Sequence, residues 1–220
     1  MHVKCFLRQA RRTRLTAGFV RRYGEMVPGS AKLQRQTDDE LIERVRRGET
    51  RLFALLVVRY QDPVYGMALR FVRGAADAED VAQEAFLRAY RSLEGFKGDA
   101  RFSTWLYRIT WNLCTDWLRR NRKPARASVA LDDDADVADG RVDLEEGLLA
   151  AEERRKVRQA LDGLAEKYRS VLILMYYQKM SYDQIASVLE VPMKTVETRL
   201  YRARKLLRQS LQREGVGGAG

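Results

Sequence analysis

The segment FKGDARFSTWLYRITWN (residues 96–112) combines five aromatic with three basic side chains, a composition suited to unpaired nucleic-acid bases. Stacking of a base on an aromatic ring contributes about 1–3 kcal/mol. Phe96 and Phe102 flank the loop KGDAR, where Gly98 allows backbone freedom and Asp99 can read a base extruded from its stack. The same rings could instead all belong to a hydrophobic core, so the residues by themselves leave both interpretations open.

Helical periodicity separates this segment into two stripes. We expect a helix from Thr104 to Asn121, with Ser103 as its N-cap. One stripe is apolar and is expected to pack inside: Leu106, Ile109, Leu113 and Trp117. The second stripe, at spacing i, i+3, i+7, is expected to face nucleic acid: Trp105, Arg108 and Asn112. Three residues lie near the edge of that stripe, namely Thr104, Trp111 and Thr115, and Trp111 stays unassigned.

A second candidate site is the segment SYDQIASVLEVPMKTVETRLYRARKLLR (residues 181–208), which has the pattern of a helix-turn-helix. Ser181 and Gln184 form a capping box, and Pro192 ends one helix and starts the next. The first helix is expected to turn Ile185, Ala186 and Leu189 inward, and the second helix Val196 and Leu200.

The outward residues of the second helix suit a recognition helix in the major groove: Lys194, Thr195, Glu197, Thr198, Arg199 and Arg202. Glu197 either accepts a hydrogen bond from a cytosine amino group or orients a neighbouring arginine. The alternative interpretation is a helical hairpin with an ordinary charged face.

The charge is distributed in blocks along the 220 residues, whose net charge is +11. Residues 1–36 carry +8, residues 37–124 carry +3, residues 125–150 carry −6 and residues 151–212 carry +6. This balance indicates a polyanionic partner, nucleic acid first and an anionic membrane surface second. No apolar run is long enough to insert into a membrane.

The positioning elements are all expected to be helices, in two small domains joined by a flexible linker. The expected parts are a basic N-terminal extension (1–36), a first domain (37–124), an acidic linker (125–150), a second domain (151–212) and a flexible tail (213–220). Within the first domain, Thr37 and Glu40 form a capping box, Pro63 starts a helix, and a further helix runs from Val81 to Leu93. In the second domain, a helix is expected over Arg169–Gln178.

The extension allows three interpretations: a disordered arm or an upstream start with Met26 as the first residue, a DNA-grasping arm, or a targeting segment.

Catalytic and metal chemistry have few candidate residues. The two cysteines, Cys5 and Cys114, lie far apart, and His2 is the single histidine. We therefore expect no disulfide framework, no metal site, no cofactor and a cytoplasmic location. Cys114 is expected to be a buried small hydrophobe in preference to a redox sensor. A nuclease or deaminase lacks a residue set, whereas a stand-alone helix-turn-helix regulator remains an alternative.

Two blocks, DAEDVAQEAFLRAYRSLEGFKGDARFSTWLYRITWN and LAEKYRSVLILMYYQKMSYDQIASVLEVPMKTVETRLYRARKLL, together resemble the extracytoplasmic-function (ECF) sigma factors of bacterial RNA polymerase. The resemblance covers about residues 37–212. It implies a promoter-specificity subunit without an active site, which binds core RNA polymerase and promoter DNA and is often held by an anti-sigma factor. It also implies that the acidic linker threads the RNA-exit region.

The resemblance assigns roles to particular residues. Core polymerase binding falls on Asp80, Gln83, Glu84, Phe86, Leu87 and Arg91. Melting of the minus-ten element and capture of a flipped base fall on Phe96, Lys97, Gly98, Asp99, Phe102, Trp105, Arg108 and Asn112. The helix-turn-helix would read the minus-thirty-five element. Ala165 replaces a frequent proline of the family and Glu197 a frequent basic residue, and the latter departure affects the promoter sequence that is read.

Overall fold

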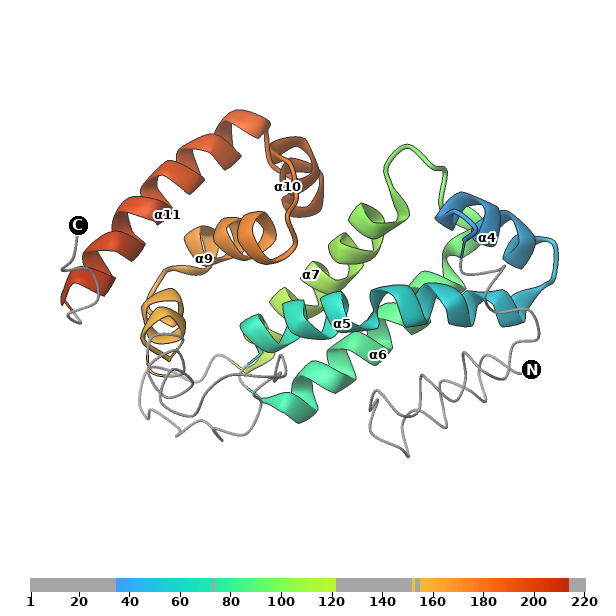
Figure 1. Cartoon of the computed structure of the whole chain (residues 1–220), viewed down its shortest axis with the longest axis horizontal. Coiled ribbons are helices and arrows are strands. Elements are labelled where there is room, and N and C mark those ends of the chain that lie inside the picture. The colour runs from blue at the N-terminus through green and yellow to red at the C-terminus, as the bar shows by residue number, and fades with distance from the viewer. Residues whose placement is uncertain (1–34, 73, 122–151, 153–154, 214–220) are drawn as a thin grey trace. The chain divides into compact units, whose positions relative to one another are not determined.

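The computed structural model describes residues 35–72, 74–121, 152 and 155–213 (Figure 1). Every regular element in these ranges is helical, and no strand occurs within them. The chain divides into two compact units, Met1–Asp132 and Asp133–Gly220. The expected all-α fold with two small helical units is therefore confirmed. Residues 1–34 of the extension, the linker at 125–150 and the tail after Arg213 lie outside the described residues.

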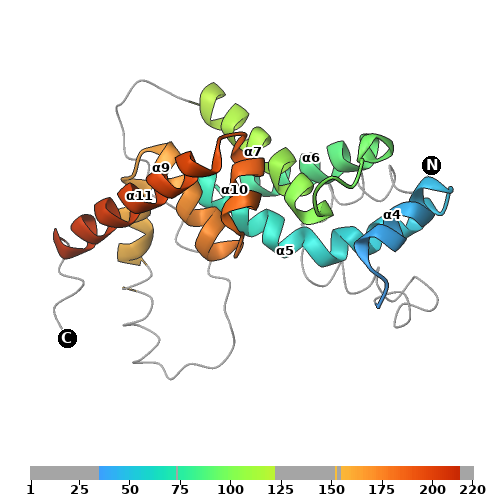
Figure 2. The same ribbon diagram turned by 90° about the horizontal axis from the view of Figure 1, so that it is seen from above.

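The first unit is built on three long helices that pack pairwise. These are α5 (Phe53–Phe71), α6 (Ala75–Arg91) and α7 (Phe102–Arg120). The shorter α4 (Asp38–Arg46) contacts α5, and the 3₁₀ turns η1 (Thr50–Leu52) and η2 (Leu93–Gly95) complete the unit (Figures 1 and 2). The largest fully buried side chains at their interface are Phe53, Leu56, Met67, Phe71, Phe86, Phe102 and Leu106.

The start of α4 follows the sequence prediction. The backbone N–H of Thr37 donates to Glu40 Oε2 at 2.8 Å, and the N–H of Glu40 donates to Thr37 Oγ1 at 3.3 Å. This reciprocal pair satisfies two backbone donors that the first turn of a helix leaves without partners. The capping box is confirmed, and three apolar residues of the helix are buried, namely Leu41, Ile42 and Val45.

Three expected boundaries in the first unit are wrong. Pro63 lies in the interior of α5 and does not start a helix. The apolar residues on both sides of it are buried, including Leu56 and Val64 at 0% exposure, and this packing outweighs the cost of about 3 kcal/mol for an interior proline. The helix expected over Val81–Leu93 begins earlier, at Ala75, because Ala78 in its first turn is also fully buried. It ends at Arg91, two residues before the expected end.

The third wrong boundary is the start of α7. The helix begins at Phe102 with Arg101 as N-cap residue, and no side chain caps it. Ser103 therefore lies inside the helix and is not its cap. The Phe102 side chain is only 1% exposed, and its burial places Phe102 in the first turn of α7. The helix therefore starts before Ser103, the residue that the local pattern favours as N-cap.

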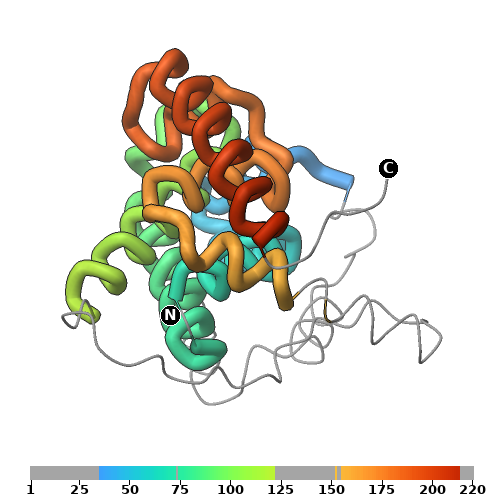
Figure 3. Tube along the Cα trace, turned by 90° about the vertical axis from the view of Figure 1, so that its left-hand side faces the viewer, coloured from blue at the N-terminus to red at the C-terminus, as the bar shows by residue number. Residues whose placement is uncertain are grey.

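The second unit contains a helical stretch at residues 155–162, then α9 (Glu166–Leu172), η3 (Ile173–Tyr177), α10 (Tyr182–Leu189) and α11 (Met193–Arg213) (Figure 3). Helix α11 packs on both α9 and α10. The single helix expected over Arg169–Gln178 is corrected: α9 starts three residues earlier, and after Leu172 the backbone continues as a π-helical turn. Four consecutive apolar residues are buried across this junction, namely Val171, Leu172, Ile173 and Leu174.

The start of α10 and the turn between α10 and α11 are both anticipated by the sequence. The N–H of Ser181 donates to Gln184 Oε1 at 2.8 Å, and the N–H of Gln184 donates to Ser181 Oγ at 3.3 Å, so the capping box is confirmed. Glu190 adopts the left-handed conformation (φ 53°) directly after α10. The carbonyl of Pro192 accepts from the N–H of Thr195 at 2.8 Å and from that of Val196 at 3.3 Å, so the proline lies directly before the first turn of α11, which begins one residue later than expected, at Met193.

Candidate nucleic-acid interface

An aromatic cluster closes the loop at residues 97–101. The ring of Phe96, before the loop, lies 5.0 Å from that of Trp105 and 6.0 Å from that of Phe102. The rings of Phe102 and Trp105 are 5.7 Å apart, and Tyr60 of α5 adds a fourth ring 5.6 Å from Phe102. These are ordinary distances for offset and edge-to-face aromatic pairs. The cluster therefore joins both ends of the loop to α5 and α7.

Burial divides this cluster into packed and accessible rings. Phe96 is 6% exposed and Phe102 is 1% exposed, whereas Trp105 is half-buried. Phe96 and Phe102, which flank the loop as expected and belong to the residues predicted for the minus-ten site, both have buried rings. Among the three rings that come from residues 96–105, that of Trp105 is the accessible one, while Tyr60 of α5 is also half-buried.

The loop itself is exposed. Lys97, Gly98 and Asp99 all lie at the surface, and Gly98 has a φ of 81°. A Cβ built on Gly98 would meet nothing within 4 Å, so the glycine serves the left-handed backbone conformation and not a close contact. The exposed Lys97 and Asp99 side chains lie on either side of it.

Along α7, the stripe expected to face nucleic acid is accessible to differing degrees. Trp105 and Arg108 are half-buried, and Asn112 is exposed. The residue left unassigned by the sequence, Trp111, lies edge-on against Phe71 of α5, with ring centroids 5.0 Å apart and planes inclined by 72°. The ring of Trp111 therefore packs against α5.

The packed side of α7 is wider than the apolar stripe predicts. Leu106 and Leu113 are buried as expected, while Ile109 and Trp117 are only half-buried. Five further residues of α7 are buried that the stripe did not include, namely Phe102, Thr104, Tyr107, Thr110 and Cys114. The hydroxyl of Thr110 donates to the Leu106 carbonyl at 2.9 Å, so this buried hydroxyl has a hydrogen-bond partner within its own helix. The side chain of Cys114 is fully buried, as expected.

The candidate residues on α6 fall on two sides of the helix. Four of them are exposed or half-buried at spacing 4, 3 and 4, which places them along one outward face: Asp80, Glu84, Leu87 and Arg91. Gln83 and Phe86 are 7% and 1% exposed, so their side chains pack inside the first unit. The outward carboxylate of Glu84 also accepts from Arg88 Nε at 2.9 Å.

In the helix-turn-helix, α11 presents the predicted outward set. Lys194, Glu197, Thr198 and Arg202 are exposed, and Thr195 and Arg199 are half-buried. Val196 and Leu200 are 0% and 1% exposed, which confirms the predicted inner face of α11. In α10, Ile185 and Val188 are fully buried while Ala186 and Leu189 are half-buried, so the inner face is shifted from the predicted one.

The basic side of α11 continues past the predicted residues with Arg204, Lys205, Arg208 and Arg213, all exposed. Arg204 Nε donates to the hydroxyl of Tyr176 at 2.9 Å, and its guanidinium lies 5.7 Å from the centre of that ring. The hydrogen bond to Tyr176 is the main reason why the pKa of Arg204 is raised. Sequence reasoning missed this pair, because the two residues are 28 positions apart.

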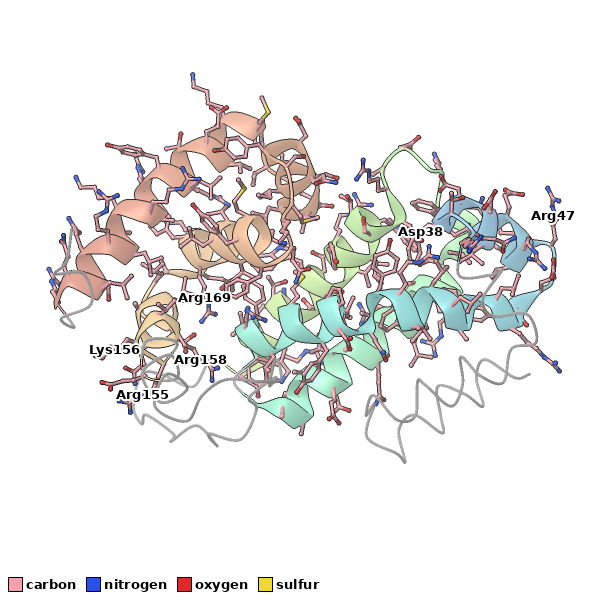
Figure 4. The ribbon with its side chains drawn as sticks, in the orientation of Figure 1. Asp38, Arg47, Arg155, Lys156, Arg158 and Arg169 are labelled. Atoms are coloured by element: carbon pink, nitrogen blue, oxygen red, sulfur yellow. The ribbon has the colours of Figure 1, made fainter. Side chains whose placement is uncertain are left out.

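A second contact missed from the sequence connects the start of α4 to the aromatic cluster. The carboxylate of Asp38, a residue labelled in Figure 4, accepts hydrogen bonds from the guanidinium of Arg59 and from the hydroxyl of Tyr60, both on α5. Burial and the bond to Asp38 raise the pKa of Tyr60. The ring of Tyr60 packs on Phe102, so α4, α5 and α7 meet at one point.

Two classes of site find no support in the part of the chain that the structure describes. No group of three or more His, Cys, Asp and Glu residues there could hold a metal ion. None of the described helices is both long and apolar enough to cross a membrane.

Comparison with known proteins connects both surfaces to one family. Residues 56–123, which include most of α5 and all of α6 and α7, match the Sigma-70 region 2 family. Residues 154–207, which include α9, α10 and most of α11, match the Sigma-70 region 4 family.

Whole-chain relatives agree with these matches. The RNA polymerase sigma-H factor of Pseudomonas aeruginosa is 41% identical over 187 residues, covering 82% of this chain and 96% of the relative. The ECF RNA polymerase sigma-E factor of Escherichia coli K12 is 37% identical over 182 residues, covering 80% of this chain and 95% of the relative.

Solved structures of similar fold include CnrH in complex with the cytosolic domain of CnrY. It is 28% identical, with a TM-score of 0.61, and the match covers 80% of this chain and 97% of that chain. The sigma factor RpoE of Bartonella quintana, solved with the anti-sigma factor NepR, has a TM-score of 0.58 over 73% of this chain and 96% of that chain. At 21% identity, this second likeness concerns the fold alone.

The chain belongs to the ECF group of the sigma-70 family of RNA polymerase sigma factors. It acts as a sigma factor that directs transcription initiation.

Proposed function

We propose that this sigma factor divides promoter recognition between its two units. The first unit binds core RNA polymerase through α6 and captures melted bases of the minus-ten element at residues 97–101 and on α7. The second unit reads the duplex minus-thirty-five element through α11. The observation that carries this proposal is the half-buried ring of Trp105, held by buried Phe96 and Phe102 next to an exposed loop.

The base-capture role is supported by the neighbours of that ring. Arg108 and Asn112 follow Trp105 on the same side of α7, one and two turns further on. An aromatic face stacks on any base, and guanidinium and amide groups add hydrogen bonds or cation–π contact. The exposed Lys97 places a positive charge beside the loop, where a phosphate of the melted strand would lie.

The polymerase-binding role rests on the outward face of α6. A row along this face combines one apolar with three charged side chains, which suits a contact in which Leu87 is covered and the charges lie at the polar rim: Asp80, Glu84, Leu87 and Arg91. Gln83 and Phe86 are proposed to support this face from inside, because their side chains are buried.

The minus-thirty-five role rests on α11 and its basic continuation. Threonine, lysine and arginine side chains at its exposed N-terminal turns suit base edges and phosphates in the major groove. The acidic Glu197 within this set favours donors such as the amino group of cytosine.

The proposed setting is the cytoplasm, where the chain works without enzymatic activity of its own. We further propose an anti-sigma factor as a partner, since the solved structures of similar fold include a sigma factor in complex with an anti-sigma factor. The domain boundaries 37–124 and 151–212 are proposed as the functional modules, with residues 125–150 connecting them.

The test is reconstitution with bacterial core polymerase that lacks any sigma subunit. The purified full chain is expected to co-purify with core polymerase and to produce promoter-dependent transcripts from a genomic library. Because phosphate contacts dominate the affinity, promoter binding is expected to weaken steeply with salt. DNA binding without co-purification would point to a stand-alone regulator, and a library without any transcript would overturn the proposal.

A further inference from the structure

Arg46, the last residue of α4, reaches the turn that follows α6. Its Nη2 donates to the carbonyl oxygen of Leu93 at 2.9 Å, to that of Glu94 at 3.5 Å, and also to that of Phe96. Its Nε donates to the Leu93 carbonyl at 3.3 Å. One guanidinium therefore binds three backbone carbonyls that lie 47 to 50 positions further along the chain.

The position of these carbonyls favours a positive donor. They lie in the turn just beyond the C-terminal end of α6, and the partial negative charge of that helix end also attracts a nearby cation. The planar fork of an arginine directs several N–H groups at once, and charged donors make the stronger hydrogen bonds. The Arg46 side chain is 29% exposed, so water competes less for these bonds than at a free surface arginine.

The contact lies at the start of the loop proposed to capture a base. Phe96, whose carbonyl accepts from Arg46, directly precedes Lys97 and the left-handed Gly98. The ring of Phe96 is at the same time packed against Trp105. The backbone and the side chain of this residue are thus fixed from two sides, by α4 and by α7.

We propose that Arg46 is a positioning residue for promoter opening: it preorganises residues 97–101 so that little conformational entropy is lost when a melted base binds. This inference rests on the proposed function of that loop. Arg46 itself touches no base; it acts through the backbone of Phe96.

Arg47 provides a matched control. It carries the same charge, and both arginines pair with the carboxylate of Glu43. Arg47 Nη2 lies 3.4 Å from Glu43 Oε2, and Arg46 Nη1 lies 3.5 Å from Glu43 Oε1. Its side chain is 75% exposed and points away from the unit (Figure 4). Arg47→Ala therefore removes one positive charge and one ion pair with Glu43, as Arg46→Ala does, and leaves the turn after α6 in place.

The experiment measures promoter opening by holoenzyme carrying the full-length chain, on a promoter labelled with 2-aminopurine across the minus-ten element. Loss of several charge-assisted hydrogen bonds in Arg46→Ala is expected to lower the amount of open complex about tenfold. Affinity for core polymerase and binding to duplex minus-thirty-five DNA are expected to stay as in the wild type. Arg46→Lys keeps the charge but not the planar fork, so its amount of open complex is expected to lie between those of the wild type and Arg46→Ala. Arg47→Ala is expected to form as much open complex as the wild type.

Hydrogen exchange of the free chain provides a second readout that separates a local effect from unfolding. In Arg46→Ala, the amides of Gly95 and Phe96, which donate to the Ser92 and Leu93 carbonyls in this turn, are expected to exchange faster, while amides of α5 and α7 keep their protection. Unchanged promoter opening and unchanged exchange in Arg46→Ala, next to an active wild type, would overturn this inference alone. A wild-type holoenzyme that opens no promoter would overturn the proposed function and this inference with it.

Discussion

The ring of Phe96 lies against the ring of Trp105, with centroids 5.0 Å apart and planes inclined by 43°. One residue precedes the loop at 97–101 and the other follows it on α7, so the contact closes the loop. Phe96 is buried and Trp105 is half-buried, so the inner ring supports the outer one. A base stacked on Trp105 would rest on a ring whose position is already fixed.

Substitutions of Trp105 therefore test the proposed base capture most directly. Trp105→Ala is expected to reduce open-complex formation by about tenfold to a hundredfold, because stacking contributes about 1–3 kcal/mol per base. Trp105→Phe keeps a stacking face and is expected to retain most of the activity. The measurement is permanganate reactivity of the minus-ten thymines. Trp111→Phe is the control, since that ring packs on Phe71; normal opening by Trp105→Ala would contradict the assignment.

Two neighbouring residues of α6 are expected to behave in opposite ways. Phe86→Ala removes a ring that is 1% exposed and is expected to lower the free energy of unfolding of the first unit by about 3–5 kcal/mol. Leu87→Ala changes the outward face and is expected to weaken binding to core polymerase with a much smaller change in stability. Urea unfolding and fluorescence anisotropy with labelled chain measure the two effects. Equal affinity of Leu87→Ala and the wild type would remove Leu87 from the interface.

The charged residues of α11 are expected to separate into those that set sequence preference and those that set affinity. Glu197→Ala is expected to change the minus-thirty-five sequences recovered when promoter DNA is selected with the holoenzyme. Arg202→Ala is expected to weaken binding uniformly and to reduce the slope of log affinity against log salt by about one, if it contacts a phosphate. A selected sequence unaffected by Glu197→Ala would exclude base reading by this residue.

Alkaline pH is expected to destabilise the first unit. Burial raises the pKa of Tyr107 to about 12, and burial with the Asp38 hydrogen bond raises that of Tyr60. An unfolded tyrosine titrates near pH 10, so the stabilising contribution is complete below about pH 10 and is lost as the pH rises towards about 12. Urea unfolding at several pH values is expected to show this decline. The decline should be shallower in Tyr107→Phe, and an unchanged decline would exclude Tyr107 as its source.

The sequence by itself determined the features whose interacting groups lie within a few residues of one another. The capping boxes at Thr37 and Ser181 each join positions three apart, and Pro192 acts on the helix that begins directly after it. For such local features, the spacing of residue types is enough. The two motif blocks likewise identified the family, which the comparisons confirm.

The tertiary structure determined the helix boundaries and buried faces at those positions where local preference and burial disagree. The interior position of Pro63, the early start of α7 at Phe102 and the inward position of Val188 all follow from packing against other helices. Periodicity identified Leu106 and Leu113 as buried, but it could not decide which aromatic rings face inward. That depended on partners far along the chain: Phe71 for Trp111, Tyr60 for Phe102, and the guanidinium of Arg46 for the backbone of Phe96. These contacts join distant segments, so only the folded chain specifies them.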